Sequence, residues 1–360
     1  MLNFLKKYNI NDEVLAVGVS GGADSLALVL CLNECLKPVK KKVVALTVDH
    51  GLRPESGDEA MYVHQLMKKL KIEHHTLRWE GKKPKTGIEE AARKARYRLL
   101  TSWCVEHQVN CLCVAHHALD QAETFMIRLQ RGSGLSGLCG MREVAIMDGI
   151  KILRPFLNKN PEDLKQYLRE HNINWITDSS NACDDFLRVR IRKFLPQMEQ
   201  AIGITPKRIV ETMKVLARSR DYIQAELDKF IKKQVRFWED NSGASLSVGV
   251  LAQQNEEIIY RVLAELIKTI GKKDYTPRAD DVERLQGKLF SSNFRGATLA
   301  GCEIFAQKGK LWIVPELKLK NRLPKKLWEE FVSENPKYLR MQLPYKLRVA
   351  LVKTKMKVEF

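Results

Sequence analysis

A short segment rich in glycine and hydroxyl groups, Ser20 to Ser25, is the part of the sequence that most directly suggests chemistry. It follows an apolar run and precedes a helical pattern. Glycine lets the backbone approach an anion without a side chain in the way, and the free N–H groups and dipole of a helix start can hold a phosphate. The segment therefore predicts a phosphate-binding loop. The alternative is a glycine-rich turn without a ligand.

We expect every residue of this loop to contribute to ATP binding. Two serines add hydroxyl donors, and Asp24 can hold the Mg²⁺ that accompanies ATP. The chain has no G-x-x-x-x-G-K-[ST] motif, whose lysine reaches the β- and γ-phosphates. Its absence suits a site that binds pyrophosphate as a leaving group. The six loop residues are Ser20, Gly21, Gly22, Ala23, Asp24 and Ser25.

Two further pairs of polar residues stand where apolar runs end. Asp49 and His50 follow one run, and His116 and His117 follow another. Polar side chains at a ligand-binding edge seldom serve packing, although one of the two adjacent histidines could be structural. These positions are therefore candidates for the same site as the loop.

The elements that would position these residues alternate between strand and helix. Such alternation predicts a parallel, doubly wound α/β sheet with helices on both faces, and ligands bind beyond the carboxyl ends of such strands. Strand patterns cover 14–19, 43–48, 75–79 and 111–115, and helical patterns cover 55–70 and 88–107.

The second half of the chain has a different pattern. Asn160-Pro161 is typical of a helix start, and helical patterns follow at 205–233, 254–270 and 280–288. A hairpin is expected over 302–314. We predict a boundary near residue 203, which gives an ATP-binding domain at 1–203, a mainly helical domain at 204–315 and a basic tail at 316–360. The tail mixes cations with aromatic residues, which suits RNA but also a docking helix.

The composition narrows the class of partner and the compartment. Lys and Arg number 61 against 43 Asp and Glu, a net charge of +18 over 360 residues. This excess favours an anionic polymer, although a generally basic protein would also show it. No secretory or membrane segment is visible. The eight cysteines form no C-x-x-C pair, so a reducing cytoplasm is expected.

S-G-G-x-D-S after a first strand resembles the PP-loop ATP pyrophosphatase superfamily. Further motifs resemble its tRNA(Ile)-lysidine synthetase branch: DHGLR from Asp49, EAAR from Glu90, the run from His116 to Met141, and Arg154-Pro155-Phe156. Further matching positions are Trp175, Asp178, Ser180, Asn181 and Arg188 through Arg192.

The resemblance implies ligation of L-lysine to the wobble cytidine of the CAU-anticodon isoleucine tRNA, with ATP consumed through an adenylated base. Asp120 and Glu123 could share a helix face and hold the lysine amine or accept its proton. Arg93, next to Arg96 and Tyr97 on one helix face, could clamp a phosphate or be a solvated face. Implied site residues are Asp24, Asp120, Glu123, Arg93 and His116 for catalysis, and Arg131, Arg188, Arg190 and Arg192 for RNA.

Two residues depart from the family pattern. Leu119 stands where the family often has the first Asp of H-H-x-D-D, and we expect its side chain to face the sheet. Val189 stands where Asn often precedes the late arginines. Two alternatives follow: another PP-loop tRNA-modifying enzyme such as a thiolase, although thiolases of the thiocytidine type usually carry C-x-x-C pairs, or a tRNA-binding relative without activity. The intact loop argues against the second.

Overall fold

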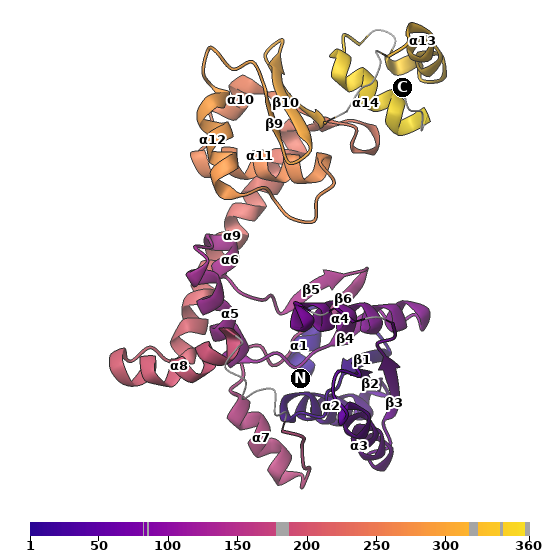
Figure 1. Cartoon of the computed structure of the whole chain (residues 1–360), viewed down its shortest axis with the longest axis vertical. Helices are drawn as coiled ribbons and strands as arrows, with labels where there is room; N and C mark the ends of the chain where they lie inside the picture. Colours follow the sequence, from indigo (N-terminus) through magenta and orange to yellow (C-terminus); the bar gives the residue numbers. More distant parts are fainter. Residues whose placement is uncertain (82, 85, 178–186, 317–322, 339–340, 357–360) are drawn as a thin grey trace. The chain divides into compact units, whose positions relative to one another are not determined.

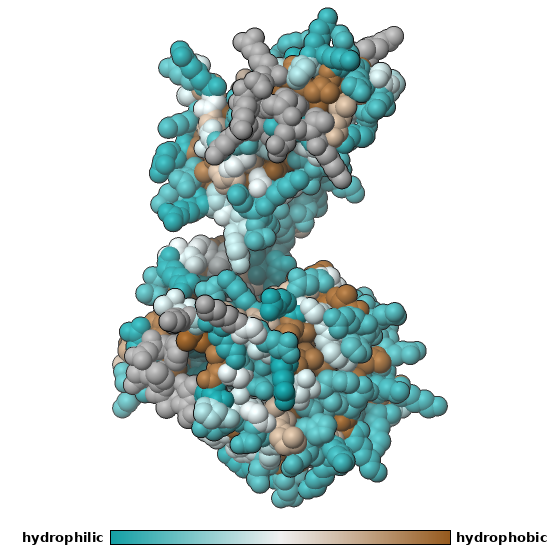
Figure 2. All heavy atoms as spheres, turned by 45° about the vertical axis from the view of Figure 1, so that its right-hand side comes forward, coloured by the Kyte–Doolittle hydropathy of each residue, from teal (hydrophilic) through white to brown (hydrophobic). Residues whose placement is uncertain are grey.

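The computed structural model (Figure 1) describes residues 1–360 except 82, 85, 178–186, 317–322, 339–340 and 357–360. The chain divides into two compact units, Met1–Arg220 and Asp221–Phe360. The division falls within the long helix α9 (Pro206–Gln234), about 17 residues beyond the boundary expected near 203. Hydrophilic side chains cover most of the visible surface of each unit (Figure 2).

Unit 1 is built on a six-stranded sheet of order β3-β2-β1-β4-β6-β5. The first five strands in this order run parallel, and β1 lies between β2 and β4. The chain thus leaves β1 to one side for β2 and β3 and later returns to the other side for β4, a topological switch point at which ligands bind. The strands are β1 Val14–Gly18, β2 Lys42–Asp49, β3 Glu73–Arg78, β4 Cys111–Cys113, β5 Val144–Met147 and β6 Ile150–Leu153.

Helices cover both faces of this sheet, which confirms the predicted α/β class. Leu15 and Val17 of β1 pack in one core with α2, α3 and α7, whereas Ala16 packs in the other with α4. Alternate residues of a strand point to opposite faces, so a strand buried on both sides is apolar throughout. The helices of this unit are α1 Leu2–Lys7, α2 Ala23–Leu36, α3 Ser56–Lys69, α4 Ile88–Glu106, α5 Ala118–Gln130, α6 Leu135–Leu138, α7 Pro161–Glu170 and α8 Leu187–Ile202.

One edge of the sheet is an antiparallel hairpin that the sequence analysis did not predict. β5 pairs with β6 across the turn Asp148-Gly149, and both turn residues have positive φ, 50° and 81°. Asp-Gly between two apolar runs is a strong hairpin signal, so this element was readable from the sequence. Thr101 Oγ1 on α4 donates to Asp148 Oδ2 at 2.9 Å and fixes the turn against the helix.

Unit 2 contains a five-stranded antiparallel sheet of order β7-β8-β11-β10-β9. The predicted hairpin is confirmed as β10 and β11, which pair from Cys302↔Pro315 to Gln307↔Lys310. Its remaining strands are short and escaped the sequence analysis because they lack a long alternating pattern. The strands are β7 Arg236–Phe237, β8 Ala244–Ser247, β9 Ala297–Leu299, β10 Cys302–Gln307 and β11 Lys310–Pro315.

This second sheet is also covered on both faces. Leu311 and Ile313 of β11 pack with α11 and α12, whereas Trp312 and Val314 pack with α13 and α14. The alternation along β11 therefore joins the C-terminal helices to the rest of the unit. The segment that the sequence analysis treated as a basic tail contains both of these last helices. The helices are α10 Val248–Ala252, α11 Glu256–Ile270, α12 Ala279–Leu289, α13 Lys325–Glu334 and α14 Tyr345–Met356.

Within the described parts of the chain, every helix is too short or too polar to cross a lipid bilayer.

Candidate active site

The glycine loop joins β1 to α2 at the carboxyl edge of the unit 1 sheet, as predicted. Gly22 is the N-cap of α2 and has no side chain with which to cap the first turn. The amide groups of that turn therefore face outward without a side-chain acceptor, an arrangement suited to an anion. The Asp24 carboxyl group lies in the same turn.

Gly21 is required by both its backbone and its surroundings. Its φ of +84° lies in the left-handed region, where a side chain costs energy. A Cβ would also lie 2.7 Å from Ile176 Cδ1 and 3.1 Å from Val63 Cγ2. The Ile176 N–H donates to the Gly21 carbonyl at 3.0 Å. The loop is thus held closely from outside while its amides remain available.

The two loop serines bond mainly within the loop. Ser25 Oγ accepts from the Ser20 N–H at 3.1 Å and donates to the Gly22 carbonyl at 2.9 Å. The Ser20 Oγ lies 3.3 Å from Ser25 Oγ. Because the Ser25 hydrogen is already donated to Gly22, Ser20 is the donor in this pair, and its hydroxyl must rotate away from Ser25 to reach a phosphate.

His117 connects the loop helix to α5. Its Nε2 lies 3.4 Å from Asp24 Oδ2, and its Nδ1 accepts the Asp120 N–H at 3.4 Å. Because Nδ1 is an acceptor, the neutral ring carries its hydrogen on Nε2, directed at Asp24. Burial opposes the charged ring, but the Asp24 and Asp120 carboxylates outweigh burial and raise the pKa of His117.

Asp120 takes part in a capping box at the start of α5. Its Oδ2 accepts the His117 N–H at 2.9 Å, while the His117 side chain receives the Asp120 N–H. Such reciprocal bonds satisfy two amides at a helix start. Asp120 therefore has a structural role as well as a place beside the loop.

Glu123 lies one turn further along α5 and is fully buried. Arg192 Nε donates to its Oε1 at 2.6 Å, and Arg188 Nε lies 3.4 Å from its Oε2. Burial raises the pKa of Glu123 against the opposing effect of Arg192, but we judge the carboxylate to be ionised because two guanidinium groups face it. Two of the predicted RNA-binding arginines are therefore engaged by a predicted catalytic acid.

The arginines of α8 lie differently from the alternate spacing noted in the sequence. Because residues 187–202 are helical, Arg188 and Arg192 are four apart and share the face that meets Glu123, whereas Arg190 is exposed on another face. Arg131 is exposed at the C-cap of α5. Arg190 and Arg131 are the two arginines of the predicted RNA set that remain on the surface.

A second group of cations surrounds His116. The Arg93 and Arg96 guanidinium carbons lie 5.2 and 5.8 Å from the Tyr97 ring centroid, as expected for one face of α4. Burial lowers the pKa of His116 to about 3, with the nearby guanidinium groups of Arg154, Arg93 and Arg96 adding to the shift and Asp120 opposing it. His116 is therefore neutral at physiological pH.

Asp49 and His50 lie at the carboxyl end of β2, beside the loop strand. Asp49 Oδ1 accepts the Gly51 N–H at 2.9 Å and so shapes the following turn. Burial, and next Arg96, lower the pKa of His50. Its Nδ1 is buried without a hydrogen-bond partner, so this ring is available to a ligand.

Buried polar atoms without a partner are concentrated in this region. Among the described residues, eight such side-chain atoms occur, and six of them belong to unit 1. An unpaired buried donor or acceptor costs about 1–3 kcal/mol, so a group of them indicates a surface shaped for a ligand. The six atoms are Asp24 Oδ1, His50 Nδ1, Tyr97 Oη, His116 Nδ1, Glu123 Oε2 and Arg154 Nε. Of these, Glu123 Oε2 has no hydrogen bond but is ion-paired with Arg188, so it is not left for a ligand.

Comparison with known proteins agrees with this geometry. Residues 1–199 match the family model described as the PP-loop domain. The tRNA(Ile)-lysidine synthase of Orientia tsutsugamushi is 35% identical over 80% of this chain and 66% of its own length. The synthases of Wolbachia pipientis wMel and Hyphomonas neptunium are 35% and 34% identical over 85% of this chain, and over 71% and 82% of their own lengths. The chain belongs to the tRNA(Ile)-lysidine synthase family.

Membership of this PP-loop family makes the chain an ATP-dependent ligase that acts in tRNA modification. Among solved structures, the U34-tRNA thiolase NcsA from Methanococcus maripaludis, with its [4Fe-4S] cluster, covers 56% of this chain and 71% of its own chain at 17% identity, with a TM-score of 0.49. Three family-motif positions, Asp178, Ser180 and Asn181, lie outside the described residues.

The two departures from the synthase pattern lie on packed faces of the helices. Leu119 packs against Leu195, Ile209 and Met213. The expectation that it faces the sheet was wrong, because the start of α5 turns this position toward α8 and α9. Val189 is also buried. Burial of an apolar side chain at each position stabilises the fold, whereas burial of an acid or an amide there would cost free energy.

The sequence did not reveal a chain of hydrogen bonds that runs from the residue before the glycine loop, Val19, through β2 to β3. Thr47 Oγ1 on β2 donates to the Val19 carbonyl at 2.9 Å and receives His74 Nε2 at 2.8 Å. His74 Nδ1 faces His64 Nδ1 at 3.2 Å. Burial, and then the nearby His64 and His75 rings, lower the pKa of His74 to about 4. Single histidines in different elements carry no spacing signal, so only the fold reveals them.

Proposed function

We propose that this chain ligates L-lysine to C2 of the wobble cytidine in an isoleucine tRNA with a CAU anticodon, at the carboxyl edge of the unit 1 sheet. The single observation that carries the proposal is the uncapped glycine loop facing Asp24, His117 and Asp120. The family match supports the substrate class. The modified tRNA would be charged with isoleucine instead of methionine.

The first step is adenylation of the base. The C2 oxygen of the cytidine attacks the α-phosphorus of ATP, a P–O bond forms, and pyrophosphate leaves. The amides of the first turn of α2 and the Ser20 hydroxyl bind the departing pyrophosphate. Arg93 and Arg96 add positive charge from α4, where their guanidinium groups lie near the Tyr97 ring.

Asp24 is the residue that we assign to Mg²⁺. The fit rests on its carboxylate: Oδ1 is buried without a hydrogen-bond partner, and Oδ2 lies 3.4 Å from His117 Nε2. A hard cation prefers carboxylate oxygen, and the histidine fixes the orientation of the side chain, as second partners of metal ligands do. The ion supplies charge neutralisation on the phosphates when bound.

In the second step the ε-amine of lysine attacks C2, a C–N bond forms, and AMP leaves. The amine must first lose a proton because its ordinary pKa is about 10.4. We assign that contact to the Asp120 carboxylate, which the capping box holds beside His117. We assign Glu123 to positioning, because its carboxylate holds Arg192 and Arg188 of α8 against α5.

The tRNA is the macromolecular partner that the charge favours. The net charge of +18 matches a polyanion whose affinity depends on released counterions. Exposed Arg131 and Arg190 are the unit 1 candidates for its backbone. The seven cysteines among the described residues are all unpaired, which fits a reaction in the reducing cytoplasm.

Pyrophosphate release tests the proposal. The full chain, given ATP, lysine and the CAU tRNA, should release pyrophosphate and incorporate labelled lysine in equal amounts. Ornithine, one methylene shorter, serves as the matched control for the amine. Pyrophosphate release that requires a sulfur donor in place of lysine would indicate a thiolase, and no release with any amine would indicate a binding protein.

A further inference from the structure

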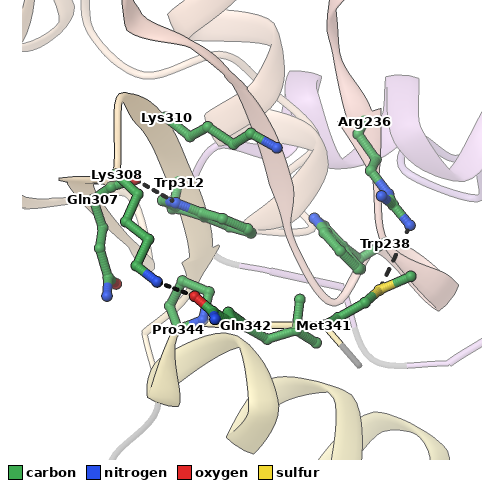
Figure 3. Close-up of a pocket in the computed structure, with 10 residues that line it drawn as sticks. Arg236, Trp238, Gln307, Lys308, Lys310, Trp312, Met341, Gln342 and Pro344 are labelled. Carbon is green, nitrogen blue, oxygen red and sulfur yellow. Dashed lines mark hydrogen bonds between the residues drawn. The ribbon is translucent and has the colours of Figure 1, made fainter. Parts of the chain in front are cut away.

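A cavity in unit 2 combines aromatic, amide and cationic side chains and has no place in the ligation chemistry. Its volume is about 230 Å³. Three separate segments form it: strand β7, the turn between β10 and β11, and the stretch that leads into α14 (Figure 3). The lining residues that matter here are Arg236, Trp238, Lys308, Lys310, Trp312 and Gln342.

Two indoles form the wall of the cavity. Trp238 and Trp312 are each 6% exposed, and their ring centroids lie 5.9 Å apart at 28°. Their N–H groups are bonded inside the unit, to Ser245 Oγ and to the Gln307 carbonyl. Both rings are therefore fixed, and the small exposed part of each indole adds apolar surface to the cavity.

Cations stand around this wall. The Arg236 guanidinium carbon lies 4.2 Å from the Trp238 ring centroid, and Lys308 donates to the Gln342 side chain. Lys310 extends across the same opening in Figure 3. All three cations are exposed, and no acidic residue lines the cavity among the described residues. The lining thus attracts an anion and places the exposed part of two indoles beside it.

We propose that this cavity binds one unpaired nucleotide of the tRNA substrate. A nucleotide joins a flat π-system to a phosphate, which matches the indole wall and the cations. Gln307 and Gln342 carry amides that can pair with a base edge. A duplex does not fit this chemistry because its bases are stacked inside. The proposal rests on the proposed function only in taking tRNA as the source of the nucleotide.

A matched pair of double variants tests the proposal in the full chain. Arg236→Ala with Lys310→Ala removes two cations from the cavity, whereas Lys288→Ala with Arg295→Ala removes the same charges from exposed positions in unit 2 outside its lining. The probe is a labelled five-nucleotide single-stranded RNA, measured by fluorescence anisotropy. We expect roughly a tenfold loss of affinity in the first double variant and less than a twofold loss in the second.

A second arm isolates stacking from charge. Trp312→Phe keeps an aromatic ring and should bind the oligonucleotide within about threefold of the parent, whereas Trp312→Leu should lose roughly tenfold. Thermal unfolding of each variant shows whether the unit is still folded. If the Trp312→Leu variant is unfolded, the comparison of the two double variants alone tests the proposal.

Equal losses in the two double variants would overturn the proposal, because net charge would then explain the binding. Competition by an acidic peptide as strong as by the oligonucleotide would also overturn it and make the ligand a protein. Failure of the proposed ligation is distinguishable: lysine incorporation would be absent while oligonucleotide binding remained sensitive to Arg236 and Lys310.

Discussion

The two units use buried polar groups in opposite ways. In unit 1, six buried side-chain atoms lack a hydrogen-bond partner, and all belong to residues at or near the carboxyl edge of the parallel sheet. In unit 2, only Ser242 Oγ and Arg348 Nε do so among the described residues. Unit 2 instead encloses its polar indole N–H groups and exposes cations.

This difference teaches how each unit meets its ligand. Unpaired buried atoms are costly in the folded protein, and they are kept where charge changes during a reaction. Fixed aromatic rings with exposed cations cost little and suit a ligand that is bound without being altered. We therefore assign the chemistry to unit 1 and additional RNA contacts to unit 2.

The substitution Asp24→Ala is the strongest test of the assignment of the chemistry to unit 1. Loss of this carboxylate should lower pyrophosphate release roughly 100- to 1,000-fold, because the loop would lose its proposed Mg²⁺ contact. Asp58→Ala, an acid in the first turn of α3, is the matched control and should keep near-normal activity. Steady-state pyrophosphate release measures both. Near-normal release from Asp24→Ala would remove the loop from the chemistry.

Asp120→Asn separates catalysis from capping. The asparagine can still accept the His117 N–H, so thermal stability should stay unchanged, while lysine transfer should fall roughly 100-fold with the lost charge. Asp120→Ala should lose the same activity and, in addition, about 1 kcal/mol of stability. Full lysine transfer by the asparagine variant would leave Asp120 as a cap only.

Thr47→Val tests whether the hydrogen bonds behind the loop position it. The valine keeps the shape but leaves the Val19 carbonyl without its donor. We expect the KM for ATP to rise about 5- to 10-fold, in line with the worth of one buried hydrogen bond, with kcat little changed. Thr47→Ser retains the hydroxyl and should restore the KM. Equal KM values for all three proteins would contradict a positioning role.

His74→Gln should have the smallest effect, on the pH dependence of stability. The folded pKa of His74 is about 4, below its unfolded value near 6.5. As the pH falls, the His74 ring is therefore protonated in the unfolded chain before it is protonated in the folded chain. The free energy of unfolding decreases as the pH falls from about 6.5 to 4. Glutamine can still donate to Thr47 but does not titrate. The urea midpoints measured at pH 7 and at pH 5 should differ less in the variant than in the parent protein. If this difference is the same in both proteins, His74 does not contribute to the pH dependence of stability.

The strands β1, β2 and β4 of unit 1 were predictable because they are buried on both faces and read as unbroken apolar runs. The ends of β1, β2 and β4 also placed Ser20, Asp49 and His116 at one edge. The short strands of unit 2 were not predictable, because two to four residues give no periodicity. In addition, β8 pairs with β11, which lies more than 60 residues further along the chain.

The partners within the site could not be predicted from spacing. Asp120 and Glu123 are three apart, which suggested one shared task, but the fold directs Asp120 to His117 and buries Glu123 against Arg192. Those pairings depend on where α8 packs, and the sequence near Arg192 says nothing of α5. The alternate arginines likewise became a helical pair only once residues 187–202 proved to be a helix.

Pyrophosphate release in the absence of lysine tests the central claim most directly. The account predicts that the full chain, mixed with ATP and the CAU tRNA alone, releases about one pyrophosphate per bound tRNA and transfers the labelled adenylyl group to that tRNA. Lysine added afterwards should then release AMP without further ATP. Pyrophosphate formed without tRNA, or no adenylylated tRNA before lysine is added, would contradict two-step chemistry at the carboxyl edge of the unit 1 sheet.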